Sequence, residues 1–144
     1  MNEAEKNMKA LFDTIPMAIM FWDMSFNIMY CNREWLRVLE LSSVEECIEK
    51  FPQLMPEYQP EGMLSIDKLM VANKETVEKG EARFQWTHYN SKGEFVNLEI
   101  ASVLGNFMGV DGVYPGFDTS ALKKGVNPRK SHEKSKKLSL QLFH

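Results

Sequence analysis

The strongest constraint on how this chain can fold lies in residues 83–100, where two alternating segments flank a glycine-containing turn. In both segments every second residue is large and apolar, aromatic or histidine: Phe84, Trp86, His88, Val96, Leu98 and Ile100. A period of two residues is typical of a strand with one buried face. The intervening "NSKG" fits a short hairpin loop. The stretch therefore predicts an antiparallel hairpin that packs on a core.

Further strands are expected on either side of a helical middle region. Residues 17–23 and 26–31 are apolar and β-prone and are separated by a Met24–Ser25 turn, which indicates a second hairpin. A last strand is expected over residues 112–118. Strands at both ends with helices between them predict an α+β fold, in which one antiparallel sheet carries the helices on one face.

Capping residues mark the helices. A short amphipathic helix is expected over residues 2–13, and the longest helix over residues 66–79, where Gly80 ends it. Residues suited to N-cap positions precede the three later helices: Asn32, Ser43 and Ser65.

Charge divides the chain into a body and a tail. Residues 1–122 carry 10 basic and 19 acidic side chains, whereas residues 123–144 carry 7 basic and one acidic. The acidic body argues against nucleic-acid binding, and no apolar run is long enough to insert into a membrane. We expect an N-terminal helix over residues 1–13, one domain over 14–122, and a basic, disordered tail after it.

Few residues could support catalysis or metal binding. Cys31 and Cys47 have no CxxC spacing and no neighbouring histidine, which favours buried thiols in a reducing cytoplasm over a disulfide or zinc site. His88 and Glu99 could face each other across the long hairpin and perform acid–base chemistry, or could be a polar cross-strand pair. We predict that the chain has no metal site and is not an enzyme. A small α+β enzyme that uses His88 and Glu99 is kept as the third hypothesis.

Four stretches in this order resemble a PAS domain of the type found in bacterial sensor histidine kinases. "IPMAIMFWDMSFNIMYCNREWLRVL" resembles the first hairpin and helix, and "FPQLMPEYQPEGMLS" resembles the connector before the long helix. "RFQWTHYNSKGEFVNLEI" resembles the long hairpin, and "FDTSALKK" resembles the "DIT" exit motif. The resemblance covers residues 12–124 and implies a five-stranded antiparallel sheet in the order 2-1-5-4-3.

The resemblance also implies a ligand cleft between the sheet and the helices. We expect a cavity of a few hundred Å³ behind Trp86. Its expected lining is Tyr30, Met70, Trp86 and Leu98. Haem is not expected because residues 64–79 contain no histidine, and photoactive flavin is not expected because "YCNREW" has the wrong order for that chemistry. The cofactor is therefore left unknown, and a small organic ligand remains the first hypothesis.

Signalling modules of this kind relay shape changes to a partner. The resemblance places the signal exit at Asp118 and Thr119, leading to an effector domain or protein in a two-component system. A homodimer is expected through the N-terminal helix, at Met8, Leu11 and Phe12. The second hypothesis is a protein–protein interaction module that binds no ligand.

Three features depart from the family pattern. Pro115 lies in the expected central strand, which should therefore be bent or short. Gly125 and Pro128 break the helix that would normally continue after the exit motif. No kinase signature follows, so we expect a standalone module, a truncated form or a degenerate product.

Overall fold

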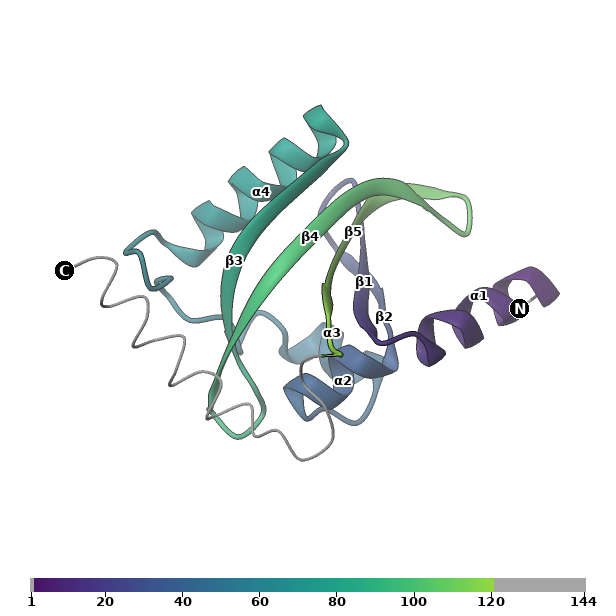
Figure 1. The fold of residues 1–144 in the computed structure, drawn as a ribbon, viewed down its shortest axis with the longest axis horizontal. Coiled ribbons are helices and arrows are strands. Elements are labelled where there is room, and N and C mark those ends of the chain that lie inside the picture. Colours follow the sequence, from purple (N-terminus) through teal and green to yellow (C-terminus); the bar gives the residue numbers. More distant parts are fainter. Residues whose placement is uncertain (1, 121–144) are drawn as a thin grey trace.

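A computed structural model describes residues 2–120 of the 144-residue chain. Five antiparallel strands form one sheet in the order β2-β1-β5-β4-β3 (Figure 1). The strands span Met17–Asp23 (β1), Ile28–Cys31 (β2), Glu81–Tyr89 (β3), Phe95–Phe107 (β4) and Val110–Asp118 (β5). The predicted α+β class and strand order are confirmed, and β1 pairs directly with β5 at the centre of the sheet.

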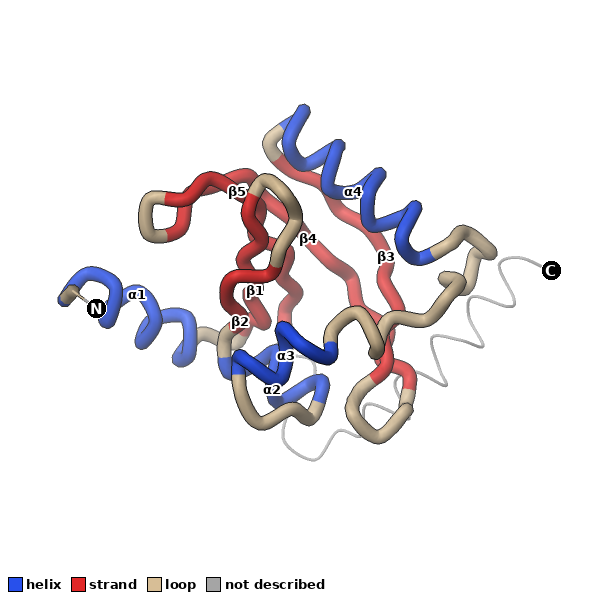
Figure 2. Tube along the Cα trace, turned by 180° about the vertical axis from the view of Figure 1, so that it is seen from behind, coloured by secondary structure: helices blue, strands red, loops and turns tan. Residues whose placement is uncertain are grey.

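The helices are distributed unequally around the sheet. They span Glu3–Thr14 (α1), Arg33–Leu39 (α2), Val44–Lys50 (α3) and Ser65–Lys79 (α4). Seen from behind, α2, α3 and α4 lie in front of the strands, whereas α1 extends to one side (Figure 2). We call the face under α2–α4 the inner face and the opposite one the outer face. None of the helices within residues 2–120 is long and apolar enough to cross a bilayer.

The inner face carries the main core, as the alternation in the long hairpin predicts. Phe84 pairs with Ile100 and Trp86 pairs with Leu98, so all four side chains share one side of the sheet. Helices α2 and α3 close the core over them with Trp35, Val38, Leu39 and Cys47. Aromatic side chains dominate this core because three tryptophans and Phe51 all pack into it.

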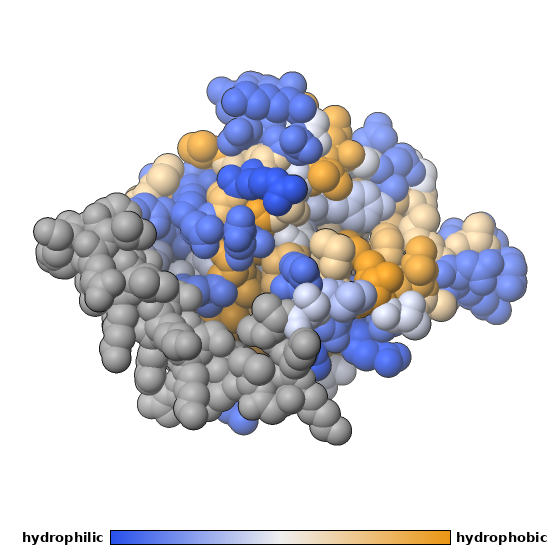
Figure 3. Space-filling model, in the orientation of Figure 1, coloured by the Kyte–Doolittle hydropathy of each residue, from blue (hydrophilic) through white to orange (hydrophobic). Residues whose placement is uncertain are grey.

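The outer face carries a smaller aromatic cluster beside α1. Met8 and Phe12 of α1 pack against this outer cluster, which consists of Phe21, Tyr30, Phe107 and Tyr114. The rings of Phe12 and Phe107 stack with their centroids 6.2 Å apart. Figure 3 shows apolar surface next to the N-terminal helix on this side of the molecule.

The central strand accommodates Pro115 by interrupting its ladder on one side only. Strand β5 is nine residues long and pairs without a gap with β4, where Pro115 faces Ser102. On the β1 side the register passes from Ile19–Gly116 to Trp22–Val113 and leaves out the residues between. Proline has no N–H to donate, so the interruption falls where that donor is missing. Of the two expected alternatives, a bent or a short strand, the short strand is wrong.

Two of the three predicted helix caps are confirmed. The side chain of Asn32 accepts from the N–H of Trp35, and that of Ser43 accepts from the N–H of Glu46. The predicted cap at Ser65 is wrong, because α4 begins at Ser65 itself. Its hydroxyl instead accepts a 2.7 Å hydrogen bond from the Gln59 side chain.

Gln59 also covers part of the exposed edge of the sheet. Its buried amide accepts from the Thr87 N–H at 2.8 Å and donates to the Thr87 carbonyl at 3.1 Å, as a neighbouring strand would do. Further along β3, the Tyr89 N–H donates to the Leu54 carbonyl at 2.7 Å. The proline-rich connector thereby satisfies edge groups that would otherwise be open to another chain.

Candidate functional site

A small cavity lies between the inner face and the helices. Its volume is about 20 Å³, and its walls come from Met20, Trp22, Trp35, Phe51, Leu69, Asn73, Phe84, Trp86, Ile100 and Pro115. A space of this size holds about one water molecule. The expected cavity of a few hundred Å³ behind Trp86 is wrong, because the large aromatic side chains fill most of the space between α4 and the sheet.

The structure separates the four residues predicted to line this cleft. Trp86 lines the cavity, and Leu98 is buried beside it on the inner face. Tyr30 pairs with Phe21 and belongs to the outer cluster on the other side of the sheet. Met70 is 50% exposed, on the outward side of α4. Only Trp86 of the four therefore touches the cavity.

Most of the cavity wall comes from residues that the sequence reasoning did not select. Trp22, Trp35, Phe51 and Asn73 line the cavity, and none of them is among the residues expected to line the cleft. Asn73 lies four residues after Leu69, so the helical repeat places both on the buried side of α4. The sequence signal that could have identified Asn73 is a polar residue on the helix face that packs against the sheet.

His88 is buried and neutral. Its Nδ1 accepts a 3.2 Å hydrogen bond from the indole N–H of Trp86, and its ring stacks on Phe51. Burial lowers the pKa of His88 to about 3, and contact with the backbone of Phe51 offsets part of that shift. The imidazole is thus a core acceptor near neutral pH.

The acid–base hypothesis for His88 and Glu99 is wrong. His88 pairs with Val96, whereas Glu99 pairs with Gln85, three residues before His88 in β3. Side chains alternate between faces along a strand, so the fully buried His88 lies on the inner face and the exposed Glu99 on the outer face. The sheet separates the two groups, and no proton can pass directly between them.

The two cysteines are buried neighbours. A hydrogen bond with Cys47, together with burial, raises the pKa of the Cys31 thiol. Within residues 2–120, no group of three or more His, Cys, Asp or Glu side chains is arranged to hold a metal ion.

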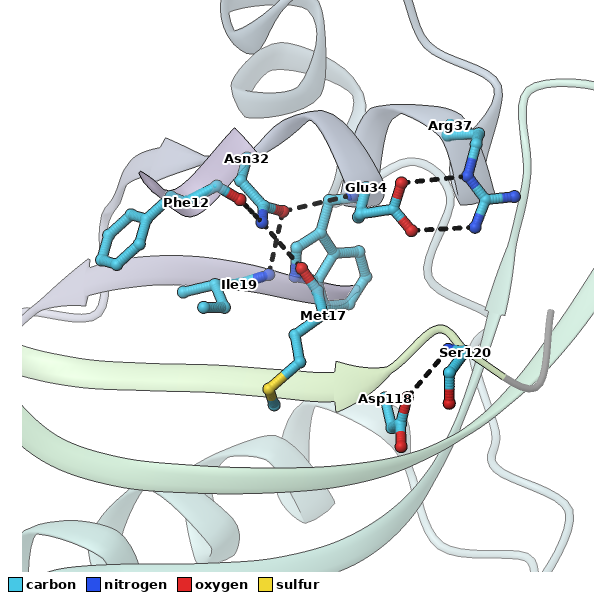
Figure 4. Close-up of polar contacts among 9 residues, drawn as sticks. Phe12, Met17, Ile19, Asn32, Glu34, Arg37, Asp118 and Ser120 are labelled. Carbon is cyan, nitrogen blue, oxygen red and sulfur yellow. Dashed lines mark hydrogen bonds and ion pairs between the residues drawn. The ribbon is translucent and has the colours of Figure 1, made fainter. Parts of the chain in front are cut away.

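Asn32 joins three elements through one buried side chain (Figure 4). Its Nδ2 donates to the carbonyls of Phe12, at 2.6 Å, and Met17, at 2.7 Å. Its Oδ1 accepts from the N–H groups of Ile19, at 2.9 Å, and Trp35, at 3.4 Å. The end of α1, the start of β1 and the start of α2 are therefore held by the same amide.

The predicted exit residues lie beside this junction. The Thr119 N–H donates to the Pro16 carbonyl at 3.0 Å, and Asp118 pairs with Met17. Asp118 accepts from the Ser120 N–H at 2.8 Å. Hydrogen bonds with the Ser120 side chain and with its N–H lower the pKa of the Asp118 carboxyl group. The chain thus enters the sheet and leaves it at the same place. The predicted continuation through Gly125 and Pro128, and the basic tail, lie outside the described residues.

An ion pair on α2 lies near the same junction (Figure 4). Arg37 donates to both carboxylate oxygens of Glu34, at 3.2 and 2.9 Å. This hydrogen bonding lowers the pKa of Glu34. The pair is partly exposed, so its direct contribution to stability is small.

The predicted dimer residues divide between the outer cluster and the surface. Met8 and Phe12 pack against the outer cluster of their own chain. Leu11 is 58% exposed and is available for a second molecule.

Comparisons with family models and with curated proteins give one match, which covers less than half of the chain. A family model described as "PAS domain" matches residues 6–74. No curated protein matches the sequence.

Solved structures agree in fold at low sequence identity. A PAS domain from Colwellia psychrerythraea is 16% identical, with a TM-score of 0.58, covering 81% of this chain and 97% of that one. A domain of a sensory box sensor histidine kinase/response regulator from Geobacter sulfurreducens is 14% identical, with a TM-score of 0.59, covering 80% and 94%. The PAS domain, in complex with ethanol, of a LuxR-family transcriptional regulator from Burkholderia thailandensis is 17% identical, with a TM-score of 0.55, covering 78% and 96%.

Replacing Asn32 should destabilise the domain strongly. We expect Asn32→Ala to lower the free energy of unfolding by about 3 kcal/mol, because it leaves buried backbone carbonyl and N–H groups unpaired. Urea unfolding measures the change. Asn27→Ala, in the exposed β1–β2 turn, should change the free energy by less than about 0.5 kcal/mol. A similar small loss for both variants would contradict the role given to Asn32.

His88 should make the domain lose stability on mild acidification. Its pKa is about 3 in the folded state and its ordinary value is 6.5, so the unfolded chain binds the extra proton as the pH falls below 6.5. From pH 7 to pH 5 we expect a loss of about 2 kcal/mol from this group. The stability should be regained as the pH rises again.

The matched variant is His88→Gln, which keeps an acceptor for the Trp86 indole but cannot titrate. Urea unfolding at pH 7 and pH 5 should show most of the pH dependence removed in this variant. The carboxyl groups of Asp23, Glu34 and Glu46 have lowered pKa values, so they titrate below this range. Equal pH dependence in both proteins would show that His88 is not responsible.

Proposed function

We propose, from the premise that this chain carries a PAS domain, that it is a sensory and regulatory domain of a bacterial signal-transduction protein. It performs no chemistry of its own. A change in the inner core alters the arrangement of the helices over the sheet, and the altered shape passes to a partner through the exit at Asp118 and Thr119.

One observation carries this proposal: the two ends of the domain are hydrogen-bonded to each other. Thr119 donates to Pro16, directly after α1, and Asn32 ties that same segment to α2. Trp35, the third residue of α2, lines the inner cavity. A displacement of α2 by a ligand would therefore act on the entry and exit segments together.

The input we propose is a small molecule in the inner cavity. A neighbour of the same fold, the regulator domain from Burkholderia thailandensis, was solved with ethanol bound. The cavity here is about 20 Å³, so a larger ligand requires α4 and the sheet to separate. That requirement couples binding to a shape change, since the ligand favours the more open arrangement.

The outer face supports a second candidate function, a homodimeric interaction module without a ligand. Leu11 of α1 and Val103 of β4 are exposed, at 58% and 45%. Exposed apolar surface beside α1 favours association with a second copy (Figure 3). The two functions are compatible, because a dimer through α1 would receive the same displacement.

The output we propose is an effector domain or protein, in a cytoplasmic two-component pathway or a related regulatory one. Similar folds occur in a sensor histidine kinase/response regulator and in a transcriptional regulator. At 14% and 17% identity, these structures support a shared fold only. Experiment must therefore identify the output.

The relay predicts that loosening α1 will selectively expose the exit amide. We expect Phe12→Ala to raise the hydrogen-exchange rate of the Thr119 amide about tenfold, equivalent to about 1.4 kcal/mol. The Thr87 amide, held by Gln59 at the far edge of the sheet, serves as the internal reference. Its rate should rise by less than about twofold.

Asn7→Ala is the matched control, because Asn7 also lies in α1 but is exposed. It should leave both amides nearly unchanged. If Phe12→Ala accelerates Thr87 and Thr119 equally, α1 merely stabilises the whole domain and the relay is wrong.

A further inference from the structure

Three buried N–H donors around the cavity have no hydrogen-bond partner. They are the indole Nε1 of Trp22, the indole Nε1 of Trp35 and the amide Nδ2 of Asn73. Their side chains all line the same small space, from β1, α2 and α4 respectively. The exposed fractions of the three residues are 6%, 2% and 4%, so bulk water does not serve these groups.

Three unpaired N–H donors on the residues that line one small cavity are unusual. Most buried polar groups in folded proteins are hydrogen-bonded, and leaving one unpaired costs roughly 1–3 kcal/mol. Aromatic rings are too weak as acceptors to replace a carbonyl or hydroxyl oxygen. The ring of Phe51 is nearly perpendicular to those of Trp22 and Trp35, at interplanar angles of 86° and 73°. An oxygen atom inside the cavity has two lone pairs, enough to accept from two of these donors.

The cavity walls define the rest of the ligand. No charged side chain of residues 2–120 lines the space, so an anion would enter without a cation to pair with. Met20, Leu69 and Ile100 provide apolar walls. Rotation about the Asn73 side chain can present either its N–H or its oxygen, so a hydroxyl could donate there while accepting from the indoles.

We propose that the space between Trp22, Trp35 and Asn73 binds a small uncharged molecule with one oxygen and a short hydrocarbon chain, such as an aliphatic alcohol or ketone. This rests on the proposed sensory function and names its ligand class. The oxygen accepts from the two indoles and contacts the Asn73 amide, while the hydrocarbon lies against Met20 and Leu69.

The size of the cavity sets how binding changes the protein. About 20 Å³ accommodates one water, so a ligand of four heavy atoms must displace flexible side chains, with Met20 and Leu69 the most adaptable. The three donors belong to separate elements. An oxygen bound among them therefore fixes the spacing of β1, α2 and α4, and α2 carries that change to the junction at Asn32.

The test is NMR titration of the ¹⁵N-labelled full chain with 1-propanol. The indole protons of Trp22 and Trp35 should move saturably to higher frequency as they gain an acceptor, with a Kd of about 1 mM. The Trp86 indole already donates to His88 and is the internal control, so it should move little. Absence of saturable movement at Trp22 and Trp35 would overturn the proposal.

Two further probes separate the ligand classes. Propionate has the same carbon chain with a negative charge, and xenon is apolar without an acceptor. Both should bind at least about fivefold more weakly than 1-propanol, because propionate would bury an unpaired charge and xenon makes no hydrogen bond. Equal or tighter binding of either probe would overturn the proposed chemistry.

Asn73→Leu removes the amide at similar volume, and it should fold because Nδ2 has no partner to lose. It should weaken 1-propanol binding about fivefold, whereas Asn27→Leu, in the β1–β2 turn, should not change it. Unchanged binding in the Asn73 variant would exclude the amide from the site.

The same spectra distinguish failure of this inference from failure of the proposed function. Movement of the Trp22 and Trp35 indoles without movement of the Thr119 amide would support the ligand class but contradict the relay. No movement of the indoles would overturn the ligand class, while the α1 variants test the relay independently.

Discussion

The buried side chain of Asn32 is the interaction on which the arrangement of this domain depends. Its amide holds the carbonyls at the end of α1 and the start of β1, and it accepts from Ile19 in β1 and Trp35 in α2. Backbone groups in a buried position must be paired or they cost free energy. One amide meets that requirement for three elements, so the position of each depends on the others.

This constraint gives a physical basis to the signalling function proposed above. The exit strand joins the same junction through the bond from Thr119 to Pro16. The inner core reaches it through Trp35, which lines the cavity and lies in the first turn of α2. His88 adds no acid–base chemistry, because it is held neutral as an acceptor for Trp86. What the core can transmit is therefore a change of packing.

The sequence predicted the fold well where local pattern and burial agree. The two-residue alternation around "NSKG" placed Phe84, Trp86, Leu98 and Ile100 on one face, as the structure shows. The resemblance to PAS domains supplied the strand order, which no local pattern encodes. Asn32 was identified as a helix cap, but its bonds to Phe12 and Met17 reach 20 and 15 residues back along the chain. Such long-range contacts leave no local sequence signal.

The residues that line the cavity were predicted less well than the fold. Tyr30 was assigned to the cleft, but the pairing shifts between Phe21 and Trp22, and Tyr30 faces outward beside Phe21. Met70 was chosen as the apolar residue of α4, whereas that helix buries Ala72, Asn73 and Thr76. A hydrophobic pattern cannot find a helix face built from small and polar side chains.

Native-state hydrogen exchange in increasing denaturant tests the central claim most directly. The amides of Ile19 and Trp35, which donate to Asn32, and of Thr119, which donates to Pro16, should open together with one free energy and one denaturant dependence. That result would show that the entry segment, α2 and the exit behave as a single unit. Opening of Thr119 at a clearly lower free energy, independent of the other two, would contradict it.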